Sequence, residues 1–231
     1  MKEEIILSGR GTILRKNDQK EMRIILDSNH LEKIFLINGN NFYSQNIIKA
    51  NLIVKPNDCY MVINKSDEEI EVSYNDDFSN HRTIYNPYKF ELSKKAKIDP
   101  EQFIKKFNVP NGFLDILNKW YSIKFIYSDY NLIYIKPGIG ISIQTHKFRS
   151  EAWKILKGKP IIINANKVYY FVDAGTKFIN DKMMYHSILN PNDDSEQFVI
   201  VEERWSGKFN EEDIVRVFNP NNYRKTIVNE M

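Results

Sequence analysis

The amino-acid sequence predicts a mainly β protein, folded as a barrel or a sandwich. Short runs rich in Ile, Val, Tyr and Phe follow one another along the 231 residues, as in CYMVIN (59–64) and NLIYIKP (131–137). Turn-forming clusters such as NGNN (38–41) and KPND (55–58) separate them, at intervals of roughly 8–12 residues. Helix signals are few, and the main ones lie in one stretch near residue 100. This combination is typical of antiparallel barrels and sandwiches.

The first 95 residues read as antiparallel β structure. The expected strands are EMRIIL (21–26), EKIFLI (32–37), IIKANLIV (47–54), CYMVIN (59–64) and EIEVSY (69–74). A faint internal similarity relates this half to the second: EKIFLING (32–39) resembles WKILKG (153–158), and CYMVINKSDEEIEV (59–72) resembles MYHSILNPNDDSEQFVIV (184–201). Two barrels of about half the chain each explain the similarity, and so does shared strand and turn composition.

The stretch from 96 to 119 predicts a helical connector. Asp99 can cap a helix that has Pro100 at its first position. Asn111 can cap a second helix, whose apolar face is expected to carry Phe113, Leu114 and Leu117.

From residue 120 onward the β runs return, among them ISIQTH (141–146), AWKILKG (152–158) and EQFVIVEERW (196–205). The aromatic residues of YSIKFIYSDYNLIY (121–134) lie at strand spacing, which favours a core over a stacking platform for a ligand. Near the C-terminus, EEDIVRVF (211–218) predicts a closing turn or a short helix.

Charge and composition exclude several classes of function. The formal net charge is only +3, with 33 basic and 30 acidic residues interspersed, so no nucleic-acid binding is expected. No apolar run approaches the ~18 residues of a membrane span, and we expect neither a membrane protein nor a secretion signal. The lone cysteine, Cys59, excludes an internal disulfide and fits a reducing compartment, so a cytoplasmic protein is expected. An anionic small molecule stays open as a ligand.

Polar side chains recur where a barrel interior is expected, in the segment PGIGISIQTHKFRSEAW (137–153). If ISIQTH forms a strand, Ser142, Gln144 and His146 share one of its faces. Glu151 begins a second alternation a short turn later. An uncompensated carboxylate among apolar side chains costs several kcal/mol, and a bound cation removes that cost.

The spacing of these residues has a recognisable form. Five residues separate Gly138 from Gln144, one separates Gln144 from His146, four separate His146 from Glu151, and six separate Glu151 from Gly158. Later in the chain, ten residues separate Gly175 from His186, and three separate His186 from Asn190. The intervals match the two motifs of the cupin barrel, with Gln in place of the first His of the usual His-x-His pair. Residues 119–217 resemble the cupin domain of type II phosphomannose isomerases, usually fused to a mannose-1-phosphate guanylyltransferase. The matching segments are KWY (119–121), PGIGISIQTH (137–146), RSEAW (149–153) and EEDIVRV (211–217).

The resemblance implies a mainly β fold of the cupin, or jelly-roll, type. We expect a metal-binding cupin domain at 120–231 and the helical connector at 96–119. The β-rich domain at 1–95 is interpreted as a degenerate second cupin barrel, which would make the chain a bicupin.

The resemblance and the donor types together predict a metal site. The predicted ligands are Gln144, His146, Glu151 and His186. Two imidazoles, a carboxylate and an amide oxygen suit one divalent ion, zinc first, with manganese, iron, cobalt or nickel as alternatives. A single His on a strand is more often structural, so the prediction depends on the combined spacing. His30 and His81 lack such neighbours and are interpreted as structural.

The function implied by the resemblance is that of a mannose-6-phosphate isomerase-like enzyme, which interconverts an aldose and a ketose phosphate through an enediol. Arg149, which matches the Arg of the family motif, is the expected phosphate ligand, with Lys147 and Arg204 as further candidates. A structural ion pair is the alternative role for Arg149. Glu202 and Lys154 are the candidates for the base, because they flank strands expected to face inward.

The sequence also departs from the family pattern, which leaves alternatives open. Asp181 and Met183 stand where the second motif usually has Pro and Gly, and Ala152 replaces the His next to the family's Trp. Another phosphosugar or a nucleotide sugar is therefore an alternative substrate, and a different metal-dependent reaction, such as an oxygenation, is an alternative activity. A sugar-binding or assembly module without turnover is the alternative of another class. By analogy with the fold, a homodimer is expected.

Overall fold

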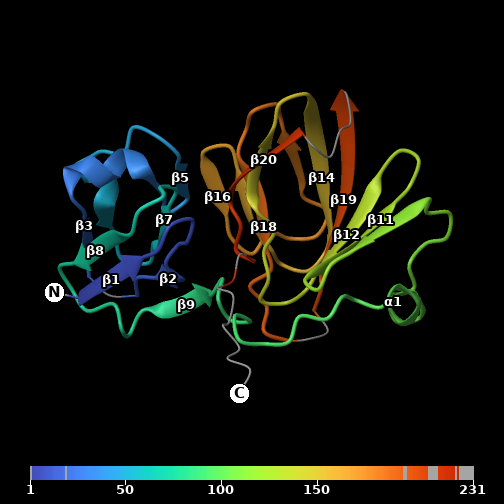
Figure 1. The fold of residues 1–231 in the computed structure, drawn as a ribbon, viewed down its shortest axis with the longest axis horizontal. Helices are drawn as coiled ribbons and strands as arrows, with labels where there is room; N and C mark the ends of the chain where they lie inside the picture. Colours follow the sequence, from blue (N-terminus) through green and yellow to red (C-terminus); the bar gives the residue numbers. More distant parts are fainter. Residues whose placement is uncertain (1, 19, 195–196, 208–212, 222, 224–231) are drawn as a thin grey trace, which may run out of the picture.

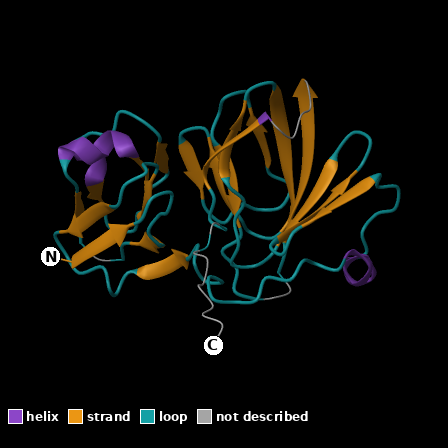
Figure 2. Cartoon of the chain, viewed as in Figure 1, coloured by secondary structure: helices purple, strands orange, loops and turns teal. Residues whose placement is uncertain are grey.

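The computed structural model describes residues 2–18, 20–194, 197–207, 213–221 and 223. Strands dominate it, and the described chain forms three antiparallel sheets (Figure 2). Figure 1 shows two adjacent bodies of strands, a smaller N-terminal one and a larger C-terminal one. The predicted mainly β class is confirmed.

In the N-terminal half a small sheet packs on part of a long one. The small sheet consists, in spatial order, of β1 (Lys2–Ile6), β8 (Ile70–Tyr74), β3 (Met22–Ile25) and β6 (Ile53–Val54). The facing strands of the long sheet are β5 (Asn41–Tyr43), β4 (Ile34–Asn38), β7 (Cys59–Asn64), β2 (Leu14–Lys16) and β9 (Arg82–Tyr85). Alternate buried residues such as Ile24, Leu36 and Val62 fill the space between the two. Two 3-10 turns, η1 (Ser28–Lys33) and η2 (Lys49–Leu52), connect the strands.

The C-terminal half repeats this arrangement on a larger scale. Its own sheet consists of β10 (Asp115–Asn118), β11 (Ser122–Ile126), β12 (Asn131–Ile135), β19 (Val199–Gly207), β14 (Arg149–Lys157) and β17 (Lys177–Asn180). The facing strands of the long sheet are β20 (Ile214–Phe218), β13 (Ile143–His146), β18 (His186–Leu189), β15 (Ile161–Asn164) and β16 (Lys167–Tyr169). The core between the sheets includes Ile133, Trp153, Ile188 and Val201.

The long sheet runs through both halves, and β5 and β16 join them. Lys167 pairs with Asn41, and the backbone N–H of Phe42 donates to the carbonyl of Asn166 at 2.9 Å. Next to this junction the two halves bury a shared apolar cluster that includes Phe35, Met61, Ile161 and Ile163. Two sandwiches that share one sheet fit the bicupin interpretation, which stays a prediction.

The helix α1 (Pro100–Phe107) begins where its sequence signals predict. The Asp99 carboxylate accepts hydrogen bonds from the backbone N–H groups of Glu101 and Gln102, at 3.0 and 3.2 Å. Asn108, with a φ of 48°, takes the left-handed conformation that ends the helix. Among the described residues, no helix has both the length and the apolar character needed to cross a membrane.

Aromatic packing holds α1 on the outer face of the C-terminal half's own sheet. The Phe103 ring lies 5.1 Å from Tyr134 and 6.1 Å from Phe125, centroid to centroid. Both partners are buried and come from the aromatic stretch at 121–134, so its interpretation as core is confirmed.

The second predicted helix is wrong. The segment after Asn111 forms β10, which pairs with β11 in an antiparallel hairpin. Its side chains alternate with period two: Ile116 joins the cluster beneath α1, while Leu117 faces the opposite side of the sheet. Pairing with β11 supplies backbone hydrogen bonds that outweigh the local helix signals.

Two shorter segments also differ from the prediction. Residues Ile214–Phe218 form the strand β20, paired with β13, and not a turn or helix, while 211 and 212 lie outside the described residues. In the expected strand at 47–54 only the last two residues form a strand, β6, because η2 occupies the middle. The Asn51 side chain accepts a hydrogen bond from the backbone N–H of Ile48 at 2.9 Å and stabilises that turn.

Removing the Phe103 ring should loosen the attachment of α1. We expect Phe103→Ala to lower the free energy of unfolding by about 3 kcal/mol, because this side chain is only 5% exposed and its loss leaves a cavity. Urea denaturation measures the change. Leu114→Ala is the matched control, since Leu114 is 74% exposed and its truncation should cost under about 0.5 kcal/mol. Equal losses in the two variants would contradict the packing role.

Candidate metal centre

Two histidines and a glutamate meet inside the C-terminal half. His146 comes from β13, Glu151 from β14 and His186 from β18, so both sheets contribute. One ligand atom from each lies within 4.8 Å of the other two. All three side chains are buried, with exposed fractions of 0–2%. Three of the four predicted ligands are therefore brought together.

Strand alternation delivers these side chains to the interior. Along β14 the residues Arg149, Glu151, Trp153 and Ile155 are buried and alternate with more exposed neighbours. In the opposite sheet, β13 and β18 pair so that Gln144 lies opposite His186. The Trp153 ring stands edge-on to His186 at 5.2 Å and closes the apolar side of the site.

His186 is oriented as a metal-binding histidine should be. Its Nδ1 lies 2.9 Å from the Met184 carbonyl, so this nitrogen carries the proton and donates. Its Nε2 is then a free lone pair, buried and without a hydrogen-bond partner. The Glu151 Oε2 atom, 3.7 Å away, is buried and unpartnered as well. Two orphaned acceptors facing each other fit a cation between them, so the residues present suit a metal.

The other side of Glu151 is occupied by hydrogen bonds. Its Oε1 lies 2.9 Å from Arg149 Nε and 3.0 Å from His146 Nε2. Two further nitrogens approach His146 Nε2, Arg149 Nη2 at 3.4 Å and Gln144 Nε2 at 3.5 Å. In this arrangement Nε2 carries the His146 proton, and a metal at this position would take its place.

Gln144 lies beside the ligand group, which is the name used below for His146, Glu151 and His186. Its amide nitrogen points toward His146. Its oxygen accepts a hydrogen bond from the Ser142 hydroxyl at 2.8 Å. Ser142, Gln144 and His146 thus share a face, as the alternation predicts. A half-turn of the amide would exchange nitrogen and oxygen and present the oxygen as a ligand.

The charges of Glu151 and His186 are set by burial and by their neighbours. Burial by itself raises the pKa of the Glu151 carboxyl, but the hydrogen bonds from His146 and Arg149 and the electrostatic attraction of the two imidazoles outweigh it, so the pKa is lowered. Burial lowers the pKa of His186 to about 4, and the nearby Glu151 charge offsets only part of this. At neutral pH the site presents an ionised carboxylate and a neutral imidazole, the forms that bind metals.

The three residues expected to bind phosphate are not together. Arg149 is 2% exposed and pairs with Glu151, which matches its alternative role as an ion-pair partner. Lys147 is exposed on the turn between β13 and β14. Arg204 lies on the outer face of the sheet, paired with Asp129 at 2.8 Å.

The two residues expected to supply the base also face outward. Glu202 and Lys154 are register partners on β19 and β14, at positions that alternate with the buried interior ones. Glu202 pairs with Arg204 at 2.8 Å. This placement gives neither Glu202 nor Lys154 access to a substrate at the ligand group.

A polar cavity of about 110 Å³ adjoins the ligand group and was missed by sequence reasoning. Gln144 lines it, and so do Lys124 and Glu203. The Lys124 ammonium lies 2.9 Å from Glu203 Oε1, and the Asn131 amide donates to the same oxygen at 2.7 Å. Glu203 is only 5% exposed, so this carboxylate faces the interior.

The signal for Glu203 was present in the sequence. In FVIVEERW the apolar residues Val199 and Val201 alternate, and the same period places Glu203, not Glu202, on the inner face. For Lys124 and Asn131 no such signal exists, because their nearness to Glu203 depends on the pairing of β11, β12 and β19.

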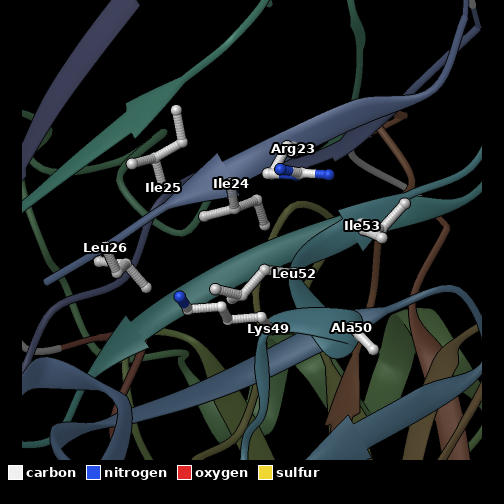
Figure 3. Close-up of a pocket in the computed structure, with 8 residues that line it drawn as sticks. All are labelled: Arg23, Ile24, Ile25, Leu26, Lys49, Ala50, Leu52 and Ile53. Atoms are coloured by element: carbon white, nitrogen blue, oxygen red, sulfur yellow. The ribbon is translucent and has the colours of Figure 1, made fainter. Parts of the chain in front are cut away.

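A larger hollow of about 670 Å³ lies in the N-terminal half, and Figure 3 shows the residues that line it. Its walls are mostly aliphatic, as with Ile24 and Leu52, and Arg23 and Lys49 are its two charged residues. It has no carboxylate or imidazole among its lining residues. This hollow is therefore unsuited to a divalent metal.

Two packed antiparallel sheets that carry two histidines and a glutamate into their shared interior define a cupin domain. Residues 105–219, just under half of the chain, match the family described as mannose-6-phosphate isomerase C-terminal. No curated protein sequence matches the chain.

The solved structures that match the chain have low sequence identity to it. An oxalate decarboxylase from Lactobacillus farciminis, in a formate complex, is 11% identical over 93% of this chain and 78% of its own, with a TM-score of 0.37. A salicylate 1,2-dioxygenase from Pseudaminobacter salicylatoxidans is 8% identical over 89% and 69%, with a TM-score of 0.32. CapF bound to 3-isopropenyl-tropolone is 18% identical over 48% and 33%, with a TM-score of 0.35. Similarity this weak carries no statement about activity.

Loss of either histidine should remove the metal site without unfolding the protein. We expect His146→Ala and His186→Ala each to weaken zinc binding by about 100-fold or more, because each removes one of three converging donors. Competition with a chelating dye measures the affinity, and circular dichroism checks the fold. His30→Ala is the control, since His30 lies in η1 outside the group. Stoichiometric zinc in the double variant would contradict the site.

Metal-free protein should lose stability on mild acidification. His186 has a folded pKa of about 4 against an ordinary value of 6.5, so the unfolded chain binds the proton more readily. The stabilisation is complete above pH 6.5 and declines as the pH falls toward 4, while the lowered pKa of Glu151 extends the loss below 4.5. We expect a loss of about 2 kcal/mol between pH 7 and pH 5, measured by urea denaturation. The loss should shrink in His186→Asn, and an unchanged profile in that variant would refute the assignment.

Proposed function

We propose that this protein is a metal-dependent sugar-phosphate isomerase resembling mannose-6-phosphate isomerases. The observation that carries the proposal is the buried group of His146, Glu151 and His186 beside a polar cavity, with Gln144 touching both. The match of residues 105–219 to the family described as mannose-6-phosphate isomerase C-terminal supports it.

His146, Glu151 and His186 would hold the ion, and the orphaned Glu151 Oε2 and His186 Nε2 are the atoms aimed at it. A bound divalent ion supplies Lewis-acid stabilisation for negative charge that develops on substrate oxygens. Zinc is the first expectation for this mixed set of nitrogen and oxygen donors, with manganese, iron, cobalt or nickel as alternatives.

Proton transfer between the two carbons requires a group in the cavity, and we assign it to the Glu203 carboxylate. Glu203 is the carboxylate among the described residues that line the cavity. Lys124 and Asn131 both bond to its Oε1, which fixes the side chain and leaves Oε2 to accept and return the proton. This role replaces that of Glu202 and Lys154, which face the opposite side of the sheet.

Two alternatives keep part of this proposal. The departures at Ala152, Asp181 and Met183 leave another phosphosugar or a nucleotide sugar as the alternative substrate. A sugar-binding or assembly module would use the same cavity without turnover. The homodimer and a reducing compartment such as the cytoplasm, the latter expected from the free thiol of Cys59, also stay as proposals.

Isomerase activity can be tested directly. We expect zinc- or manganese-loaded protein to convert mannose 6-phosphate to fructose 6-phosphate, followed by a coupled assay in both directions. Glu203→Gln should lower kcat by about 100-fold or more while metal content stays unchanged, because it removes the proton carrier and no ligand. Glu202→Gln is the matched control and should retain activity. Binding of the sugar phosphate without interconversion in the loaded protein would instead support the binding module.

A further inference from the structure

We propose that Asp213 is a positioning residue for His146, one of the three residues that would hold the metal. Its carboxylate holds the corner of the chain at which β13 ends and β14 begins. The inference rests on the metal site of the proposed function, and not on the isomerase reaction. It also gives a role to the segment EEDIVRV (211–217), which resembles the family pattern but supplies neither a ligand nor the proposed proton carrier.

The corner between the two strands is short. Lys147 and Phe148 are the two residues between β13, which belongs to the long sheet, and β14, which belongs to the sheet that faces it. His146 is the last residue of β13, and Glu151 is the third residue of β14. The path of the corner therefore decides how closely these two side chains approach each other. The approach is close, since Nε2 of His146 lies 3.0 Å from Oε1 of Glu151.

Asp213 binds two successive backbone N–H groups of this corner. Its Oδ1 accepts a hydrogen bond from the N–H of Lys147, and its Oδ2 accepts one from the N–H of Phe148, each at 2.9 Å. Asp213 is only 7% exposed. Hydrogen bonds to an ionised carboxylate are stronger than those between neutral groups. Because both oxygens are engaged, the side chain fixes two peptide groups of the corner and not one.

The pairing of β20 with β13 places Asp213 at the corner. Asp213 directly precedes β20, and Ile214, the first residue of β20, pairs with His146. The strand that pairs with the end of β13 is thus preceded by the carboxylate that binds the next two residues. His146 is held by strand pairing on one side of the corner and by the Asp213 side chain within it.

Gly207 confines the same corner at its second peptide group. Gly207 pairs with Arg149 at the start of β14. Its φ is 97°, and a Cβ at this position would lie 2.5 Å from the carbonyl oxygen of Phe148. Backbone therefore packs against the carbonyl side of Phe148, while Asp213 holds its N–H. The corner has little room to take another path.

His186 is oriented by a different contact. Its Nδ1 donates to the Met184 carbonyl, and Asp213 takes no part in that hydrogen bond. The N–H of Met183 donates to the His146 carbonyl at 2.8 Å. Loss of Asp213 is therefore expected to act through His146 and to leave His186 in place.

The test measures zinc affinity by competition with a chelating dye. We expect Asp213→Asn to weaken zinc binding by about tenfold and Asp213→Ala by up to about 100-fold, the range for residues that orient metal ligands. An asparagine keeps one oxygen acceptor, so it should retain one of the two hydrogen bonds. Circular dichroism checks the fold of both variants, and Asp213→Asn, which has nearly the same shape as the parent side chain, carries the test if Asp213→Ala fails to fold.

The matched control is Asp99→Ala. Asp99 also accepts two backbone N–H groups, but at the start of α1 and outside the ligand group. Its loss should lower the melting temperature and leave zinc affinity within about twofold of the parent. If Asp99→Ala weakens zinc binding as much as Asp213→Ala does, the effect is one of stability and the inference is refuted. Unchanged zinc affinity in both Asp213 variants refutes it as well.

A double-mutant cycle tests whether Asp213 acts through His146. In the His146→Ala background, Asp213→Ala should weaken zinc binding no further, because the side chain that it positions is absent. In the His186→Ala background it should weaken binding by its full factor. Equal further losses in the two backgrounds would show an effect on the fold as a whole and would overturn the inference.

The visible spectrum of cobalt-loaded protein gives a second readout, which a general loss of stability does not change. The spectrum should shift in Asp213→Asn and stay as in the parent in Asp99→Ala. An unchanged spectrum in Asp213→Asn contradicts the positioning role.

The outcomes separate this inference from the isomerase proposal. If the Asp213 variants weaken zinc binding as expected but the loaded parent does not interconvert the sugar phosphates, the positioning role stands and the isomerase proposal falls. If the loaded parent interconverts them while the Asp213 variants bind zinc as the parent does, the reverse holds. A parent protein that takes up no divalent metal refutes both.

Discussion

The buried carboxylate of Glu151 is the constraint around which the C-terminal half is organised. At 2% exposure it is not hydrated, and an unpaired charge at such depth costs several kcal/mol. Arg149 supplies a counter-charge from the same strand, and the long sheet contributes His146 and His186 from the opposite side. The need to surround this one group therefore fixes which faces of the two sheets meet.

The long sheet can carry His146 and His186 to the site because its two faces pack against different parts of the molecule. On β13, Ile143 packs into the cluster shared with the N-terminal half, while Gln144 lies toward the cavity. On β18, Leu189 joins that same cluster and His186 faces the ligand group. The N-terminal half contributes none of the three converging ligands. It packs against β13 and β18, the two strands that carry His146 and His186.

Local signals in the sequence predicted what depends on local chemistry. Asp99 and Pro100 predicted the start of α1, and the resemblance of the spacing to the cupin motifs predicted that His146, Glu151 and His186 converge. The second helix failed because pairing with β11, which is invisible in a linear reading, decides the state of β10. The cavity was not predicted for the same reason, because the register of β11, β12 and β19 is what brings Lys124 and Asn131 to Glu203. Strand alternation in β19 places Glu203, and not the predicted Glu202, on the inner face, and this alternation is present in the sequence.

The guanidinium of Arg149 has one more consequence. Because it bonds Glu151 within β14, the carboxylate is already neutralised by the chain itself. A barrel without an ion therefore leaves no uncompensated charge at Glu151, and folding and metal binding would be separate events at the proposed site. Which element the protein carries would then be decided by exchange with the surrounding metal pool after synthesis, and not by a requirement imposed during folding.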